Sequence, residues 1–436
     1  MLTKEQNDAL TRTGPGTPGG DLLRRFWQPI ALAKELPHGG DPLPIDILGE
    51  ELVLFRDEAN RVGLLDRHCC HRGSDLSYGR VECGGLRCLY HGWLYDVNGR
   101  CLEQPLEPKV STYKDQVRQP SYPVIERAGA FFAYMGPGAP PEFPAYDFFT
   151  YPAAHVRTNK IHVDCNYMQA NEGNYDPAHV GMLHRSFGNR GSGLNFGSLK
   201  QYGSVDISDA QIDPNETPVI KVEPTHFGMR LYQTRSGGPG KTYLRVTVFG
   251  MPNFSAIAGP QGGDGHIGIW HVPIDDRSHW RWGFALRRDK PIAAGRGENA
   301  PAAMGRDSEE FEDEFHHRRK KANRYLQDRK TFNQTFTGMG SVFGVHDAFA
   351  TETMGPIADR TREHLATSDI AIVSVRRMML KAVEDVSAGK DPVGVVRDSA
   401  SNDFSDFLSF DAVVPAGTDP GEVVRQFAVE TKAAAE

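Results

Sequence analysis

The sequence predicts an α+β protein in which an all-β domain precedes a larger domain built from an antiparallel sheet and helices. Over residues 26–139, short alternating or apolar runs such as 51–55 are separated by Gly, Asp and Asn turns, a pattern typical of an all-β domain. Over residues 140–436, longer strand-like runs are interspersed with helical stretches. Helices set against an antiparallel sheet are the simplest layered arrangement for such a segment.

Three regions are expected along the 436 residues. Residues 1–25 form an N-terminal arm with a short helix that packs on the C-terminal domain, and residues 26–139 form the all-β domain. The run Gly-Pro-Gly-Ala-Pro-Pro at 136–141 marks the boundary to the third region, 140–436. In that region we expect strands at 229–232, 242–249 and 266–270, and helices at 164–185, 307–328, 360–386 and 419–434.

Charge and hydropathy exclude several classes of protein. The 49 Lys and Arg residues are outnumbered by 56 Asp and Glu residues, and the net charge of −7 indicates neither a nucleic-acid-binding surface nor a polybasic membrane patch. The sequence contains no run of about 18 or more apolar residues, and its polar N-terminus is unlike a signal peptide. We therefore expect a cytoplasmic protein that binds neither nucleic acid nor membrane.

The cysteines cluster in a way that indicates a metal site. Five of the six fall between residues 69 and 101, whereas a disulfide framework would be spread more evenly. Cys69 and His71 form a C-x-H motif, and Cys88 and His91 form a C-x2-H motif. Two thiolates and two imidazoles can hold either zinc or a [2Fe–2S] cluster. Because each motif supplies one Cys and one His, the pattern favours a cluster with two inequivalent irons over a structural zinc site.

A second motif lies in the helical stretch at 164–185. Asp176, His179 and His184 form D-x2-H-x4-H. In an ideal helix, positions i and i+5 point about 140° apart, so a shared metal requires a distorted helix. Gly173 and Pro177 are placed to distort it. Two histidines and a carboxylate form the facial triad of non-heme Fe(II) oxygenases, which leaves coordination positions open.

Together these motifs resemble those of the Rieske non-heme iron aromatic ring-hydroxylating oxygenases, in particular the alpha subunits of the phthalate dioxygenase-like branch. The family pairs C-P-H-R-G with C-x-Y-H-G-W and adds E-x3-D-x2-H-x4-H, whose first residue is Glu172 here. The sequence departs at one position, because Cys70 stands where proline is usual. The resemblance implies an N-terminal all-β Rieske [2Fe–2S] domain and a helix-grip-like catalytic domain with one mononuclear Fe(II). The remaining cysteines are interpreted as packing thiols: Cys70, Cys83, Cys101 and Cys165.

The resemblance also implies roles for individual residues. Cys69, His71, Cys88 and His91 hold the cluster, and His179 and His184 bind the iron. Asp176 is the catalytic residue in electron transfer, because it bridges His179 to His91 of a neighbouring protomer.

The third iron ligand is expected to be a downstream carboxylate. Asp347 is the best candidate because the passage that follows it resembles the one after the iron-binding aspartate of this branch; Asp359 and Glu352 are the alternatives. An arginine suits an aromatic carboxylate, since the guanidinium can bind both oxygens. The residues expected to contact substrate are Asn171, Met182 and Arg245.

The function implied is that of a terminal oxygenase that hydroxylates an aromatic substrate with O2, with a carboxylate of the phthalate or benzoate type expected. Electrons come from NAD(P)H through a separate flavin and iron–sulfur reductase or a ferredoxin. Demethylation or another monooxygenation is an alternative within the family, and a Rieske electron-transfer protein is an alternative from another class. The expected assembly is a homotrimer, or a stacked hexamer, without a small beta subunit.

Overall fold

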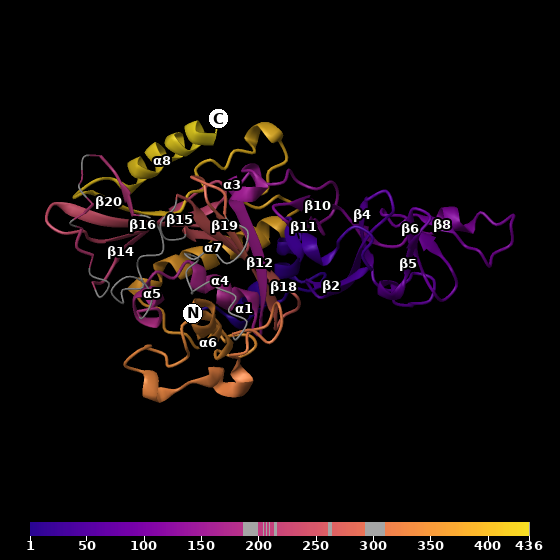
Figure 1. The fold of residues 1–436 in the computed structure, drawn as a ribbon, viewed down its shortest axis with the longest axis horizontal. Helices are drawn as coiled ribbons and strands as arrows, with labels where there is room; N and C mark the ends of the chain where they lie inside the picture. Colours follow the sequence, from indigo (N-terminus) through magenta and orange to yellow (C-terminus); the bar gives the residue numbers. More distant parts are fainter. Residues whose placement is uncertain are drawn as a thin grey trace.

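The computed structural model describes residues 1–185, 199–203, 205, 207–208, 210–212, 216–259, 264–292 and 310–435. The molecule is elongated in Figure 1, with the small sheet that contains β6 (Gly85–Arg87) at one end. Helix α5 (Ala178–Leu183) lies toward the opposite end. None of the described helices is long and apolar enough to cross a bilayer.

The N-terminal arm contains two short helices, α1 (Lys4–Thr11) and α2 (Pro18–Leu23). Thr3 and Gln6 form a capping box at the start of α1, in which each side chain accepts from the other residue's backbone N–H. Both helices contact α7 (Ile370–Ser387), the long helix of the C-terminal region. The arm therefore contacts the C-terminal region through this helix.

Three small antiparallel sheets follow the arm. Their strands are β1 (Gln28–Leu32), β11 (Ala130–Ala133) and β10 (Val124–Arg127); β2 (Leu43–Ile47), β3 (Glu50–Arg56), β4 (Val62–Asp66) and β9 (Ser121–Tyr122); and β5 (Arg80–Glu82), β6, β7 (Leu94–Tyr95) and β8 (Cys101–Glu103). The all-β prediction for this region is confirmed. A separate small apolar core fills the end of the molecule around Cys69 and Cys88, whereas the main core runs from the arm through β1, β10 and β11 into the C-terminal region.

A large sheet forms the centre of the C-terminal region. Its strands in spatial order are β12 (Val156–Val163), β19 (His279–Leu286), β18 (His266–Pro273), β17 (Phe254–Ala258), β16 (Lys241–Gly250), β15 (Gly228–Ser236) and β14 (Val219–Pro224); β20 (Phe410–Pro415) pairs with β16 and with β13 (Leu199–Gln201). The β13–β20 pair is parallel and the other pairs are antiparallel. The three strands predicted here are confirmed, as is the α+β class.

Helices accompany this sheet: α3 (Asp147–Thr150), α4 (Tyr167–Asn174), α5, α6 (Phe343–Glu352), α7 and α8 (Pro420–Ala435). The helix expected at 164–185 is split into α4 and α5, and α7 begins ten residues later than the expected 360. The predicted C-terminal helix corresponds to α8.

The prediction of a helix at 307–328 is wrong for the residues that the structure describes, which begin at 310. Phe311 pairs with His317 in an isolated bridge, and Lys321–Leu326 is a 3-10 segment. The charged residues form ion pairs eight or nine positions apart, Glu312 with Lys320 and Glu310 with Arg319. These pairs close a turn in which the chain folds back, whereas helical charge pairs lie three or four residues apart.

Candidate metal centres and substrate cavity

Two similar loops bring Cys69 and Cys88 together at the tip of the molecule. In each loop, the N–H of a glycine four residues after the cysteine donates to the cysteine carbonyl: Gly73 at 2.7 Å and Gly92 at 3.0 Å. Both glycines have φ of 75°, a left-handed conformation that glycine adopts without a steric cost. The two cysteines therefore begin turns of the same backbone geometry.

The four side chains fit a cluster with two cysteine and two histidine ligands. Both thiols are 2% exposed, and the rings of His71 and His91 lie 4.5 Å apart between centroids. Nδ1 of His91 is buried without a hydrogen-bond partner in the described part of the chain, as expected for an atom that coordinates a metal. Burial raises the pKa of Cys69 to about 11, so the free thiol stays protonated and metal binding must displace its proton.

Neighbouring residues support these loops. The indole of Trp93 stacks on His71 with ring centroids 4.3 Å apart, and the Tyr95 hydroxyl lies 3.1 Å from Cys69 Sγ. Cys70 and Cys83 are exposed, so their interpretation as packing thiols is wrong. Cys83 lies in the tight turn between β5 and β6, whereas Cys101 and Cys165 are buried as expected.

The second centre depends on the break between α4 and α5. Helix α4 ends at Asn174, and α5 begins after Pro177, so the two histidines at i and i+5 converge. His179, His184 and Asp347 each offer one ligand atom, and these atoms all lie within 4.8 Å of one another. The His184 Nε2–Asp347 Oδ1 distance is 2.8 Å, and His179 Nε2 lies 3.9 Å from the same oxygen.

The protonation states of Asp347 and His184 suit a divalent metal. Burial raises the pKa of Asp347, but the combined effects of His184, His179 and Arg281 outweigh it, so the pKa lies below its ordinary value. Burial lowers the pKa of His184 and favours the neutral imidazole that a metal needs. Asp176 Oδ2 lies 3.4 Å from His179 Nδ1, a contact that favours the tautomer with its proton on Nδ1 and leaves Nε2 toward Asp347.

The alternative carboxylates lie elsewhere. Glu352 accepts from the Tyr325 hydroxyl and from the backbone N–H of Asp164, and the exposed Asp359 accepts from Thr361. His346, next to Asp347, is fully buried, and its Nε2 lies 3.0 Å from the Thr337 hydroxyl.

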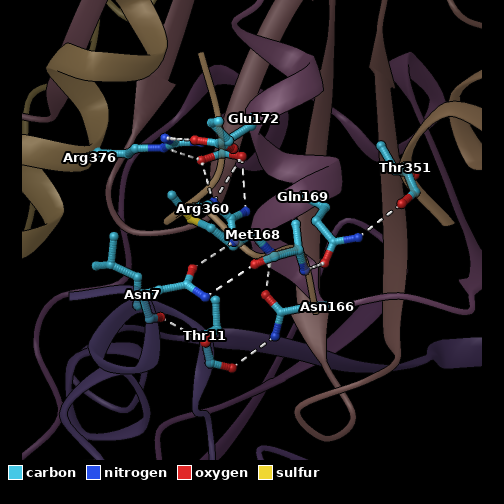
Figure 2. Close-up of polar contacts among 12 residues, drawn as sticks. Asn7, Thr11, Asn166, Met168, Gln169, Glu172, Thr351, Arg360 and Arg376 are labelled. Atoms are coloured by element: carbon cyan, nitrogen blue, oxygen red, sulfur yellow. Dashed lines mark hydrogen bonds and ion pairs between the residues drawn. The ribbon is translucent and has the colours of Figure 1, made fainter. Parts of the chain in front are cut away.

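A buried ionic network holds α4 in position (Figure 2). Glu172 on α4 lies between two arginines: Arg360 Nη2 donates at 2.9 Å and Arg376 Nε, from α7, donates at 2.6 Å. Asn7 of α1 accepts from Arg360 and donates to the carbonyl of Ala358. Burial raises the pKa of Glu172, but the two arginines outweigh it and keep the pKa below its ordinary value. The N-terminal arm is therefore linked by hydrogen bonds to α4, the helix that leads into the site formed by His179, His184 and Asp347.

A cavity of about 260 Å³ lies between the sheet and helices α4, α5 and α6, and it includes His179 and Asp347 in its wall. Alternate residues of the central strands face it, such as Ile269 and His271 of β18. The wall is mostly apolar with a few polar groups, the usual character of a small-molecule site.

The structure separates the predicted substrate contacts. Arg245 lines the cavity, but its Nη1 lies 3.7 Å from Asp411 Oδ1, so its charge is compensated. Asn171 and Met182 do not line the cavity, in contrast to the prediction. Asn171 is fully buried and donates to the carbonyl of Pro252, and Met182 is 56% exposed because α5 turns this residue outward.

Arg281 on β19 is a cavity residue that the sequence analysis missed. No carboxylate of the described residues lies within ion-pairing distance (4 Å) of its guanidinium, although Asp347 attracts it from farther away. Burial lowers its pKa, yet arginine stays charged in proteins. The sequence signal was weak: the alternation in the run 279–286 places Arg281 on one face of a strand without telling which face lines a cavity.

Comparison with known proteins agrees with both centres. Residues 26–114 match the Rieske [2Fe-2S] domain model, and residues 133–435 match the model described as LigXa C-terminal domain like. The chain is 35% identical to the phthalate 4,5-dioxygenase oxygenase subunit of Pseudomonas putida over 96% of this chain and 94% of that protein. It is 34% identical to the 5,5'-dehydrodivanillate O-demethylase oxygenase subunit of Sphingobium sp., over 92% of this chain and 85% of that protein.

Among solved structures, dicamba monooxygenase bound to dicamba shares the fold, with a TM-score of 0.53 and 20% identity over 84% of this chain and 99% of that chain. Fold and site thus define an oxygenase that combines a [2Fe–2S] cluster with a non-heme iron centre. The chain belongs to the Rieske non-heme iron oxygenases, in the branch of alpha subunits that includes phthalate dioxygenase.

Proposed function

We propose that this chain is the terminal oxygenase that hydroxylates a single-ring aromatic carboxylate, with electrons supplied by a separate reductase or ferredoxin. The observation that carries the proposal is Arg281, a half-buried cation that lines the cavity beside His179 and Asp347 without an ion-pair partner among the described residues. A substrate carboxylate would supply the missing counter-charge through two parallel hydrogen bonds.

The size and character of the cavity support a substrate with one ring. A cavity of about 150 Å³ lined by apolar side chains is enough to hold benzene. The cavity here, at about 260 Å³, leaves room for a ring with one or two substituents. Its apolar strand residues exclude water from the ring, while Arg281 orients the acid group.

We propose that His179, His184 and Asp347 hold the mononuclear iron, and that Cys69, His71, Cys88 and His91 hold the cluster. When bound, the iron supplies the O2 chemistry and the cluster supplies single electrons. The protein's own contribution is to keep Asp347 ionised, to fix the tautomer of His179 through Asp176, and to orient the substrate in a dry cavity.

The arrangement of the two centres supports electron transfer between copies of the chain. The β5–β8 sheet, next to the cluster loops, and α5, which carries His179, lie toward opposite ends of one molecule (Figure 1). His91 is half-buried at one end, and the side chain of Asp176 is 22% exposed at the other. We propose that a closed homo-oligomer, a trimer in the first instance, brings Asp176 of one copy to His91 of the next.

The test is an oxygenation assay on acid and amide pairs. The purified protein is loaded with Fe(II), supplied with electrons by a surrogate reductase and ferredoxin, and given O2 with benzoate, phthalate, methoxybenzoates or the corresponding amides. Acids are expected to exceed amides in kcat/KM by about tenfold or more, since a charge-assisted hydrogen bond is worth roughly 1.5–3 kcal/mol. Release of formaldehyde from the methoxybenzoates would identify demethylation.

The variant Arg281→Gln is expected to abolish the preference for acids. Arg157→Gln serves as the control, because Arg157 is an exposed arginine on the adjacent strand β12. Equal kcat/KM for acids and amides in the wild-type enzyme would refute the carboxylate assignment. Absence of any oxygenated or demethylated product from the iron-loaded protein would refute the aromatic substrate class.

A further inference from the structure

Two buried histidines, His279 and His271, form a hydrogen-bonded series that ends at the cavity wall. His279 Nδ1 lies 2.7 Å from the carbonyl oxygen of Cys165, and His279 Nε2 lies 2.9 Å from His271 Nδ1. His271 lines the cavity, and its remaining ring atom, Nε2, is buried without a hydrogen-bond partner among the described residues. His279 and His271 are 0% and 1% exposed, so neither ring is open to bulk solvent.

The Cys165 carbonyl determines which ring nitrogens of His279 and His271 carry a proton. A carbonyl oxygen only accepts, so His279 carries its proton on Nδ1 and, as a neutral ring, has a lone pair on Nε2. His271 must then donate from Nδ1 to that lone pair, which leaves its own Nε2 unprotonated. Burial lowers the pKa of His279 to about 3 and that of His271 well below its ordinary value, so both rings are neutral near pH 7.

The position of His271 in the sheet is also fixed. Its backbone N–H donates to the carbonyl of Asn253, and the Asn253 side chain donates back to the His271 carbonyl at 2.7 Å. In the β18–β19 pair, His271 stands directly opposite Arg281. Residues in this position have Cβ atoms roughly 5 Å apart on the same face. The cavity therefore presents a cation and a neutral acceptor side by side.

We infer that His271 is a fixed hydrogen-bond acceptor for the substrate, and that the preferred aromatic carboxylate carries a hydroxyl or N–H group on the same ring. The inference rests on the proposed function for the carboxylate, and it adds the second substituent. An ether or a methyl group at that place would leave the His271 lone pair buried and unpaired, which is the source of discrimination.

The test compares binding of hydroxybenzoates with that of the matching methoxybenzoates, as ortho, meta and para pairs. Isothermal titration of the oxidised holoenzyme under anaerobic conditions measures affinity without turnover. For one isomer, the hydroxyl compound is expected to bind about tenfold tighter or better than its methyl ether. His271→Leu should bring this ratio close to one, and His271→Gln, which retains an acceptor oxygen, should restore part of it.

His279→Leu separates the acceptor role from simple support of the fold. Without His279, the Nδ1 of His271 loses its acceptor and the ring is free to exchange tautomers, so the ratio should fall although His271 is still present. A merely structural defect would weaken both members of a pair equally.

Two outcomes overturn the inference in distinguishable ways. If benzoates bind but every hydroxyl and methyl ether pair has equal affinity in the wild type, the acceptor role is refuted and the proposed function stands. If no benzoate binds to the wild type, the proposed substrate class fails and the inference fails with it.

Discussion

Replacing Glu172 by glutamine tests whether the buried ionic network positions the iron-binding segment. The glutamine is close to glutamate in size but removes the charge between two arginines. Arg360 is 0% exposed and Arg376 is 4% exposed, while Glu172 is 11% exposed. Arg376 retains Glu363 as a partner, whereas Arg360 retains only neutral partners such as Asn7 in the part of the chain that the structure describes.

Breaking a buried ion pair by removing one partner costs about 3–5 kcal/mol, because the other charge stays buried and uncompensated. For a domain of this size, 1 kcal/mol corresponds to about 2 °C in Tm, so Glu172→Gln should lower Tm by roughly 6–10 °C. Because α4 leads directly into Asp176 and His179, the variant should also bind Fe(II) more weakly. Thermal scanning and iron analysis of purified protein measure the two effects.

Asp385→Asn is the matched control, because it removes an i,i+4 ion pair with Lys381 on the exposed face of α7. It should leave Tm unchanged within error, since such surface pairs contribute little. A Tm loss below about 2 °C in Glu172→Gln, which corresponds to roughly 1 kcal/mol, would refute the reasoning. It would mean that the arginines find other partners or water at little cost.

The pH dependence of this difference gives an independent check. The pKa of Glu172 is lower in the folded protein than in the unfolded chain, so its contribution to stability is complete above the unfolded value, about 4.3. That contribution is lost as pH falls through the folded pKa. The difference in unfolding free energy between wild type and Glu172→Gln should therefore be constant from pH 7 to about 5 and shrink below pH 4.

Three further changes have defined expected results. Tyr95→Phe removes the hydroxyl near Cys69 Sγ and should lower the reduction potential of the Rieske cluster by about 40 mV in voltammetry. The value follows because a hydrogen bond that favours the reduced cluster by about 1 kcal/mol converts at about 59 mV per 1.4 kcal/mol. An unchanged potential would contradict a hydrogen bond to the sulfur. Anaerobic Fe(II) at 100 times its Kd should stabilise the metal-depleted protein by about 2.7 kcal/mol, and Asp347→Ala should abolish this shift if Asp347 is a ligand. Asp147→Asn leaves Arg288 buried with only Asp264 nearby, so we expect the free energy of unfolding to fall by roughly 3 kcal/mol in a denaturant titration. Wild-type stability in this variant would count against a stabilising Asp147–Arg288 ion pair.

The sequence predicted those parts of the molecule that depend on local spacing. The two Cys–His loops follow from turns that close within five residues, and glycine permits each turn. The strands of the large sheet follow from their apolar alternation. The break between α4 and α5 was anticipated from Gly173 and Pro177, although their spacing could not give the position of α5, and Met182 was therefore placed on the wrong side.

Features set by long-range pairing were missed. The charged segment after residue 310 resembles a helix in composition, but its ion pairs join Glu310 to Arg319 across a turn. Arg281 and His271 become neighbours only through the register of β18 with β19. That register is determined by which face of each strand is buried, which requires the whole sheet and the helices that cover it.

The contrast between paired and unpaired polar groups in the interior locates the substrate site better than any single motif. Elsewhere in the described structure, buried charges have close partners: Lys160 lies 2.7 Å from Glu35, and Glu172 lies between two arginines. At the cavity, the half-buried Arg281 has no carboxylate partner within the described ranges and His271 offers an unpaired acceptor, although leaving such groups unsatisfied costs stability. A protein retains such a cost where a ligand removes it. The two groups stand side by side facing the same space as His179 and Asp347, so the ligand that satisfies them lies within reach of the iron centre.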